Sequence, residues 1–336
     1  INEPTAAALS FGIKNKQNRN ILVYDLGGGT FDVSIMQIKN GIIDTLATNG
    51  NHQLGGVDWD ETIVNCVLKK ENINVTCKDL KTSDFATYSS LMIAAEEAKK
   101  ILTDREKTSL RYNYKGIHNT EITLAEFEEL TQELMAMTGN IIDEAMKMAG
   151  NPKIDEVLIV GGSSRMRMVK TFIEKKFGIT PRLFEPDLAI AKGAALYAAQ
   201  EEKGYTETGL QMGDDKGSTS YGMASWVGDK HMISNLILMS DNLCVEKSFD
   251  KFSTRSDNQT GLHVALYENR VNEDVCELYL GKLLQEGDID WGYPVPKGTP
   301  AKLLVNRGKD GIIKVYIEIQ GQKKEFVINT KGIAFN

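Results

Sequence analysis

The chain has 336 residues and a formal net charge of −7 at pH 7. Its 41% hydrophobic and 25% charged residues are typical of a soluble globular protein of about two or three domains, and the acidic balance excludes the basic patch of a nucleic-acid-binding protein. No apolar run reaches the ~20 residues that span a bilayer, so we expect no membrane partner and a cytoplasmic location.

Residues 1–200 alternate strand and helix signals. Short apolar runs indicate strands, and apolar residues at three- and four-residue steps indicate helices. Strands are predicted at residues 20–24, 31–38, 42–48 and 156–160 and within 112–123, and helices at residues 86–103, 168–177 and 189–196. The alternation at residues 31–38 predicts a half-exposed strand. The order of elements is typical of an α/β unit.

A capping box from Thr123 to Glu126 predicts the start of a long helix. Its expected apolar face holds Phe127, Leu130, Leu134 and Met137. Small residues at 189–196 permit close packing of that helix against another element.

Residues 201–217 are polar and contain glycine, which predicts a linker. After them the helical signals vanish. Residues 218–332 predict a β-sandwich, because short alternating runs are separated by turn residues. The clearest runs are residues 263–267, 275–280, 313–319 and 324–328.

The most informative stretch is Asp25-Leu-Gly-Gly-Gly-Thr30. Consecutive glycines let backbone N–H groups approach an anion, and a carboxylate at a strand end can hold Mg²⁺ through water. A plain glycine-rich hairpin turn is the alternative. The stretch is neither a Walker A loop nor a dinucleotide-binding fingerprint, because no Gly-Lys-Ser/Thr follows and it leads into a strand. A second strand ends on Gly161-Gly162, so we expect a cleft at the carboxyl ends of a sheet.

Four stretches resemble, in order and spacing, the signatures of the seventy-kilodalton heat-shock chaperone family, whose members are DnaK-like molecular chaperones. They are INEPTAAA from Ile1, DLGGGTFDVS from Asp25, LGGVDWD from Leu54 and VGGSSR from Val160. The resemblance implies an α/β actin-like (ribonuclease H-like) ATPase lobe at residues 1–200, with a peripheral subdomain at 55–131, followed by an all-β peptide-binding sandwich. It also implies a fragment that lacks the family's first ATPase lobe and helical lid.

The resemblance implies that ATP or ADP binds with Mg²⁺. The expected phosphate contacts are Gly27, Gly28 and Gly29. The expected catalytic residues are Glu3, Asp25 and Thr30, and Mg²⁺ would bind through water to Asp25 and Asp187.

The resemblance also implies an adenosine pocket. The residues expected there are Glu96 and Lys99 toward the ribose, Thr103 toward the adenine, and Gly162, Ser163 and Arg165 over the base. Glu96 and Lys99 also have the spacing of an ordinary ion pair on a solvated helix face, which is the alternative for these two residues. Arg167 replaces a proline of the family's pattern, which affects loop rigidity more than chemistry.

In the second half, the resemblance implies a groove for an extended apolar peptide. Its expected lining is Met223, Trp226, Phe252, Leu262 and Val264, with sandwich core as the alternative. Trp226 and Arg255 replace the small or flexible residues that arch over the family's groove, and could narrow or redirect it. The linker lacks the family's run of leucines.

We therefore expect an ATP-dependent, stress-response chaperone of unfolded or extended polypeptides, aided by a J-domain cochaperone and a nucleotide exchange factor. Phosphoryl transfer needs charge stabilisation from both sides of a cleft, so we expect this chain alone to be nearly inactive as an ATPase. One alternative is a divergent, non-cycling scaffold that binds peptides or partners, favoured by the linker and the altered arch. Another is a small-molecule kinase of the actin-like superfamily, which the strands after Ser225 count against.

Overall fold

The structure is a computed structural model of the chain. It describes residues 1–336 except 13–16, 186–187, 204–210, 214, 309–310 and 329–336. The chain divides into two units, Ile1–Gly213 and Asp214–Asn336.

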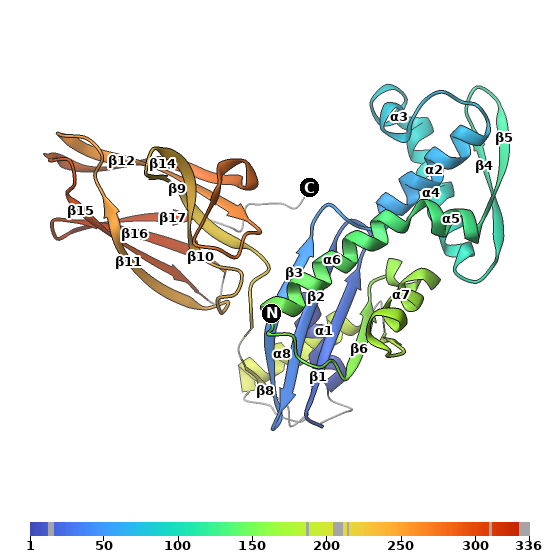
Figure 1. Cartoon of the computed structure of the whole chain (residues 1–336), viewed down its shortest axis with the longest axis horizontal. Helices are drawn as coiled ribbons and strands as arrows, with labels where there is room; N and C mark the ends of the chain where they lie inside the picture. Colours follow the sequence, from blue (N-terminus) through green and yellow to red (C-terminus); the bar gives the residue numbers. More distant parts are fainter. Residues whose placement is uncertain (13–16, 186–187, 204–210, 214, 309–310, 329–336) are drawn as a thin grey trace. The chain divides into compact units, whose positions relative to one another are not determined.

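A six-stranded sheet in the order β7-β6-β1-β2-β3-β8 forms the centre of the first unit (Figure 1). Its strands are β1 (Arg19–Leu26), β2 (Phe31–Lys39), β3 (Ile42–Asn51), β6 (Glu156–Val160), β7 (Arg182–Leu183) and β8 (Gln211–Met212). β2 is antiparallel to both β1 and β3, whereas β6 runs parallel to β1. β8 lies within the predicted linker, yet it pairs with β3 in this sheet.

Helices cover both faces of this sheet. On one face, α1 (Glu3–Gly12) packs against α8 (Ala189–Lys203), where a Cβ added at Gly193 would overlap the carbonyl group of Ala6. α6 (Gln132–Met148) crosses the other face, and α7 (Arg167–Phe177) follows β6 (Figure 1). Because β2 is covered on both sides, it is mostly buried, and the prediction of a half-exposed strand is wrong.

Residues 56–130 form a smaller layer at one end of the first unit (Figure 1). Its elements are α2 (Gly56–Lys70), α3 (Cys77–Ser83), α4 (Phe85–Leu102), β4 (Lys107–Asn113), β5 (Ile117–Thr123) and α5 (Leu124–Leu130). β4 and β5 form a two-stranded sheet. The predicted capping box is confirmed, because the backbone N–H groups of Thr123 and Glu126 each donate to the other's side chain.

The predicted long helix is interrupted at Thr131, between α5 and α6. Thr131 is buried, and its hydroxyl donates to the carbonyl oxygen of Phe127 at 2.7 Å. This break changes which residues face the core. Met135 and Ile142 are buried and Leu134 is partly buried against the core, whereas Leu130 and Met137 are exposed, so the predicted apolar face is wrong at Leu130 and Met137.

The second unit contains two sheets. The five-stranded sheet has the order β13-β10-β9-β12-β14, and the four-stranded sheet has the order β11-β15-β16-β17. The strands are β9 (Ser220–Val227), β10 (Lys230–Ile237), β11 (Val245–Ser253), β12 (Gln259–Asn269), β13 (Val275–Glu277), β14 (Lys282–Val295), β15 (Pro300–Arg307), β16 (Ile313–Ile319) and β17 (Gln322–Ile328). Both sheets contribute to one hydrophobic core, as Val264 and Val315 do. The run predicted as a strand at 275–280 ends as a 3₁₀ turn, Leu278–Leu280.

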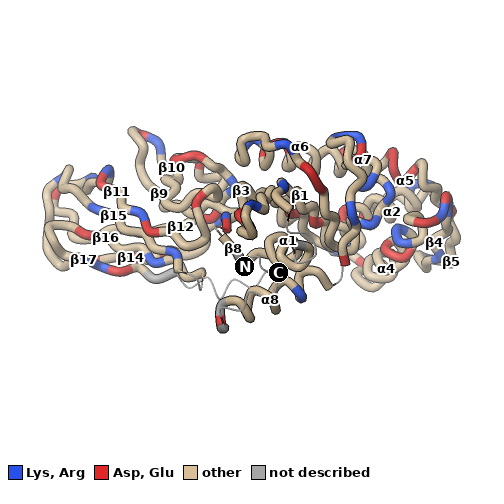
Figure 2. The backbone as a smooth tube through the Cα atoms, turned by 90° about the horizontal axis from the view of Figure 1, so that it is seen from below, with Lys and Arg blue, Asp and Glu red and all other residues tan. Residues whose placement is uncertain are grey.

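Acidic and basic positions are interspersed along both units (Figure 2). Among the helices that the structure describes, none is both long enough and apolar enough to cross a membrane.

Candidate functional site

The glycine hairpin between β1 and β2 is held by its own carbonyl groups. The N–H of Gly56 donates to the carbonyl oxygen of Gly27 at 2.9 Å, and the N–H of Val57 donates to that of Gly28 at 2.8 Å. These donors belong to the first turn of α2, whose N–H groups have no partner inside the helix. The start of α2 is therefore occupied by the hairpin.

The N–H groups of the same hairpin remain available. Within the described residues, those of Gly28 and Gly29 donate to no protein atom. Both glycines are exposed, and a Cβ at either would meet open space. Successive backbone N–H groups without a protein acceptor can form an anion-binding concavity. Gly55 permits this arrangement, because a Cβ there would overlap the backbone of Gly29.

Asp25 lies at the end of β1, beside this hairpin, and is 8% exposed. Burial, followed by the nearby charges of Glu3 and Asp32, raises its pKa from 3.8 to about 7. A cation at this position would offset both the burial and the like charges. Asp25 therefore fits the Mg²⁺ that the resemblance implies. Within the described residues no three His, Cys, Asp or Glu side chains form a direct metal-ligand group, and Asp187 lies outside the described residues.

The second glycine loop meets the first at the same sheet edge, as predicted. β6 is the parallel neighbour of β1, and Val160 pairs with Asp25. Gly161 has a φ of +81° and passes so close to Asp25 that a Cβ would lie 2.5 Å from its Oδ1. The backbone N–H of Leu26 donates to Ser164 Oγ at 2.9 Å, which links the two loops.

The remaining predicted residues of the first unit differ in exposure. Glu3 and Thr30 are exposed, at the start of α1 and on the hairpin. Ser163 is buried in a short 3₁₀ turn, Ser163–Arg165, whereas Gly162 and Arg165 are exposed. The turn places Ser163 against Gly56, because a Cβ on Gly56 would overlap Ser163 Oγ.

Lys99 is buried, so it does not lie on a solvated helix face. Its Nζ donates to Asp60 Oδ2 at 2.7 Å and to the carbonyl oxygen of Gly56 at 2.9 Å. Glu96 is exposed and pairs with Lys100 at 2.8 Å. Thr103 donates its hydroxyl to the carbonyl oxygen of Lys99 at 3.3 Å. The expected ribose residues therefore separate into a buried Lys99 and an exposed Glu96.

Sequence reasoning missed the contacts of two residues here. Asp60 is the buried partner of Lys99, and it lies inside the stretch that starts at Leu54. Arg167 Nε donates to the carbonyl oxygen of Thr103 at 2.7 Å, and its Nη1 donates to Glu106 at 2.6 Å. Arg167 thus joins the end of α4 to the second glycine loop. The position of Asp60 inside that stretch was the signal available for it, whereas Arg167 stood out in the sequence only as the replacement of a proline.

The predicted peptide-contacting residues of the second unit divide into three kinds. Met223 and Val264 lie in the hydrophobic core, 3% and 0% exposed. Phe252 and Leu262 are partly buried and pack against that core. Trp226 is 52% exposed. Met223 and Val264 therefore lie in the core of the second unit, which was the alternative to a position in a peptide groove.

Two side chains contact the ring of Trp226. The Arg255 guanidinium lies 3.5 Å from the centre of its ring, and the His231 ring stacks on it with centroids 5.1 Å apart. His231 is the partner of Trp226 across the β9–β10 pair, and Arg255 follows β11. The two positions that stand out in the sequence thus contact each other and join the end of β9 to the loop after β11.

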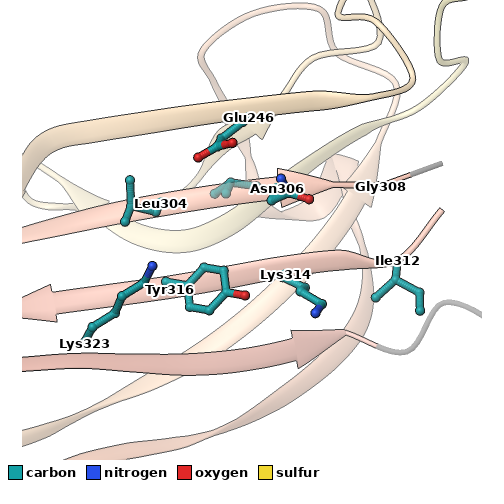
Figure 3. Close-up of a pocket in the computed structure, with 9 residues that line it drawn as sticks. Glu246, Leu304, Asn306, Gly308, Ile312, Lys314, Tyr316 and Lys323 are labelled. Carbon is teal, nitrogen blue, oxygen red and sulfur yellow. The ribbon is translucent and has the colours of Figure 1, made fainter. Parts of the chain in front are cut away.

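A separate cavity of about 480 Å³ lies on the four-stranded sheet (Figure 3). Glu246, Tyr316, Lys314 and Lys323 line it, from β11, β16 and β17. Lys323 lies over the Tyr316 ring at 4.1 Å. None of the predicted site residues lines this cavity.

The comparisons with known proteins agree on one family. A family model described as Hsp70 protein matches residues 1–333. The chain is 33% identical over 348 residues to chaperone protein DnaK of Thermosipho melanesiensis, covering 99% of this chain and 56% of that relative. It is 34% identical over 341 residues to chaperone protein DnaK of Thermosipho africanus, covering 97% and 55%. It is 33% identical over 348 residues to chaperone protein dnaK of Thalassiosira pseudonana, covering 99% and 55%.

The chain spans about half the length of these curated relatives. Its mixed α/β first unit fits the actin-like ATPase fold. The family match covers nearly the whole sequence, including both glycine loops and all strands of the second unit. The chain therefore belongs to the Hsp70 protein family.

Proposed function

We propose that the first unit forms one wall of a site for ATP or ADP with Mg²⁺, as part of an ATP-dependent molecular chaperone. The observation that carries this proposal is the pair of exposed glycines, Gly28 and Gly29, whose N–H groups donate to no protein atom in the described residues, beside the buried Asp25. Backbone donors and a carboxylate near one sheet edge suit a phosphate chain that carries a hydrated metal ion.

The residues of this chain then have separate tasks. The N–H groups of Gly28 and Gly29 bind phosphate oxygens, and the hydroxyl of Thr30 lies next to them on the hairpin. Asp25 would hold the hydrated metal ion as an acceptor for its water ligands. When bound, Mg²⁺ would neutralise part of the phosphate charge. Glu3 adds a second carboxylate near Asp25, and Asp187 is proposed from the resemblance alone.

The adenosine half of the site is formed by α4 and the second glycine loop. Lys99 and Ser163 meet at Gly56, and exposed Arg165 offers a planar cation that can stack on a purine. Exposed Glu96 pairs with Lys100 through Oε1, so its second carboxylate oxygen is the one that would accept from a ribose hydroxyl. The hydroxyl of Thr103 donates to its own helix, so Thr103 would contact the adenine as an acceptor.

These groups all approach the nucleotide from one side. Phosphoryl transfer also needs charge stabilisation at the departing and attacking oxygens. We therefore infer that the 336-residue chain binds nucleotide weakly and turns it over very slowly.

The test is a calorimetric titration of the chain with ADP, with and without Mg²⁺, alongside the variant Asp25→Asn. The proposal predicts saturable binding that Mg²⁺ strengthens at least tenfold in the wild type and no more than twofold in the variant. Equal affinity with and without Mg²⁺ in the wild type, or no heat at millimolar ADP, would contradict it. Glu121→Gln, on the exposed Lys107–Glu121 pair, is the matched control.

For the second unit we propose binding of unfolded or extended polypeptides. The chemistry would be strand-like backbone hydrogen bonding with pockets for alternate side chains. The family membership supports this, and the partly buried Phe252 and Leu262 are its nearest side-chain candidates. A J-domain cochaperone, an exchange factor that contacts residues 55–131 and a cytoplasmic location stay predictions.

A second candidate function is a non-cycling scaffold. The stack of His231, Trp226 and Arg255 favours it, because the stack joins the end of β9 to the loop after β11, where the resemblance expects a peptide to enter. Fluorescence anisotropy with a labelled extended apolar peptide separates the two candidates. Peptide affinity that changes with Mg-ATP supports the ATP-dependent chaperone, and peptide binding indifferent to nucleotide supports the scaffold.

A further inference from the structure

A buried ion pair joins α2 to α4 directly beneath the glycine loops. Lys99 Nζ lies 2.7 Å from Asp60 Oδ2, and the two side chains are 9% and 6% exposed. Burying two charges is costly unless the remaining donors and acceptors are satisfied. Here they are not, because Asp60 Oδ1 is buried without a hydrogen-bond partner in the described part of the chain. A pair kept only to hold two helices together would be better served by apolar side chains of similar volume.

The backbone of Gly56 links this ion pair to the glycine hairpin. Its N–H donates to the carbonyl oxygen of Gly27, and its carbonyl oxygen accepts from Lys99 Nζ, each at 2.9 Å. A Cβ on Gly56 would lie 2.8 Å from Lys99 Nζ and would overlap Ser163 Oγ. Lys99 therefore lies where the hairpin, α2 and the second glycine loop meet.

The hydrogen bonds of the ammonium group leave room for a ligand. A lysine ammonium has three N–H donors, and here two of them are engaged, by Asp60 and Gly56. Asp60 offers the only carboxylate within ion-pair distance of Lys99 among the described residues. Without that carboxylate, the buried ammonium would lose the partner that holds it against α2.

We propose that Asp60 is a positioning residue for nucleotide recognition: it holds Lys99 beside Gly56 and Ser163, so that the third N–H is available to a hydroxyl group of the nucleoside. This rests on the proposed nucleotide function. Asp60 itself touches neither the phosphates nor the base, and it acts through Lys99.

The experiment compares the wild-type chain with Asp60→Asn, which keeps the shape of the side chain and removes its charge. Calorimetric titrations use ADP, adenosine and pyrophosphate, each with Mg²⁺. We expect the variant to bind ADP and adenosine roughly tenfold more weakly, the effect of losing one charge-assisted hydrogen bond. Pyrophosphate affinity should stay within twofold, because the hairpin is still held by α2.

Two further variants separate positioning from a purely structural role. In a Lys99→Met background, Asp60→Asn should cause no further loss of adenosine affinity. A second loss of similar size would give Asp60 a role independent of Lys99 and overturn the proposal. Equal losses for pyrophosphate and adenosine in Asp60→Asn would indicate general distortion and overturn it too. Glu121→Gln is again the control for an exposed pair.

A measurement without nucleotide completes the design. Acetic anhydride labelling with mass-spectrometric readout should modify Lys99 at least tenfold more slowly than exposed Lys100 in the wild type. In Asp60→Asn the rate at Lys99 should rise severalfold. If Asp60→Asn leaves both this rate and the adenosine affinity unchanged, the inference fails while the nucleotide function stands. If the wild type binds none of the three ligands, the proposed function fails first, and the positioning role falls with it.

Discussion

The two units of this chain build their candidate sites from different kinds of contact. In the first unit, backbone hydrogen bonds from α2 fix the glycine hairpin, and Gly55 and Gly161 allow approaches that a Cβ would prevent. In the second unit, the exposed contact is a stack of three side chains, and two of the five expected groove residues belong to the core. A site made of backbone hydrogen bonds is rigid and depends on glycine, whereas a stack of exposed side chains can open at a small cost in free energy. We therefore expect substitutions in the first unit to lower the free energy of unfolding more than substitutions in the stack of the second unit.

Breaking the buried pair in the first unit should have the largest effect. Lys99→Met leaves Asp60 as an unpaired buried charge, and we expect the free energy of unfolding to fall by about 3–5 kcal/mol. Lys99→Met with Asp60→Asn should recover most of that loss. Urea unfolding followed by helical circular dichroism measures it, because the α-helices that the structure describes all lie in the first unit.

The matched control is Lys100→Met, which breaks the exposed pair with Glu96. Pairs of this kind contribute about 0–1 kcal/mol. A loss in Lys99→Met no greater than that of the control would show that the buried pair does not hold this region.

The stability of the first unit should also depend on the ionisation of Asp25. Burial raises the folded-state pKa of Asp25 from 3.8 to about 7, so folding favours its protonated form. This contribution is fully present below pH ~4 and is lost as the pH rises through about 7; its size is roughly 2–4 kcal/mol. The check is the difference in unfolding free energy between the wild type and Asp25→Asn across pH 4–8. A difference that does not vary with pH would refute the raised pKa.

Adding one methyl group at Gly55 should be more damaging than adding one at Gly28. In Gly55→Ala the Cβ overlaps the backbone of Gly29, and overpacking of this kind costs about 1–3 kcal/mol. In Gly28→Ala the Cβ meets open space, and we expect less than ~1 kcal/mol. Thermal unfolding measures both. Equal effects at the two positions would mean that the close approach of α2 to the hairpin does not exist in solution.

The stack in the second unit should contribute least. A double-mutant cycle of Trp226→Ala and Arg255→Ala should give a coupling free energy of about 0.5–1 kcal/mol, the value for exposed cation–π pairs. Fluorescence-detected unfolding supplies the four stabilities. Coupling above ~2 kcal/mol would mean that the stack is a structural element as firm as the glycine hairpin, and the contrast between the units would be lost.

Sequence reasoning succeeded where function depends on the backbone. Gly55 and Gly161, which allow the close approaches, lie in stretches that the sequence singles out, and the parallel neighbours β1 and β6 bring Asp25 and Gly161 together as predicted. Sequence reasoning failed where packing between residues far apart in the sequence determines which side chains are buried. Lys99 has the spacing of a surface ion pair with Glu96, but packing of α4 on α2 buries it against Asp60, 39 residues away.

Two further misses have the same cause. β2 alternates in sequence like a half-exposed strand, yet helices on both faces of the sheet bury it. Thr131 looks like an ordinary helical residue, but its buried hydroxyl and the break between α5 and α6 change the buried face. Trp226 and Arg255 stood out individually, whereas their contact depends on how the end of β9 and the loop after β11 approach each other.

The most direct test of the central claim is an NMR titration of the chain labelled with ¹⁵N-glycine. Mg-ADP is added, and the amide signals of Gly28 and Gly29 are compared with those of Gly261 and Gly292 in the second unit. The account predicts saturable shifts at Gly28 and Gly29, reproduced by pyrophosphate with Mg²⁺, and no such shifts at the second pair. Unchanged signals of Gly28 and Gly29 at saturating nucleotide would contradict the claim that this hairpin binds phosphate.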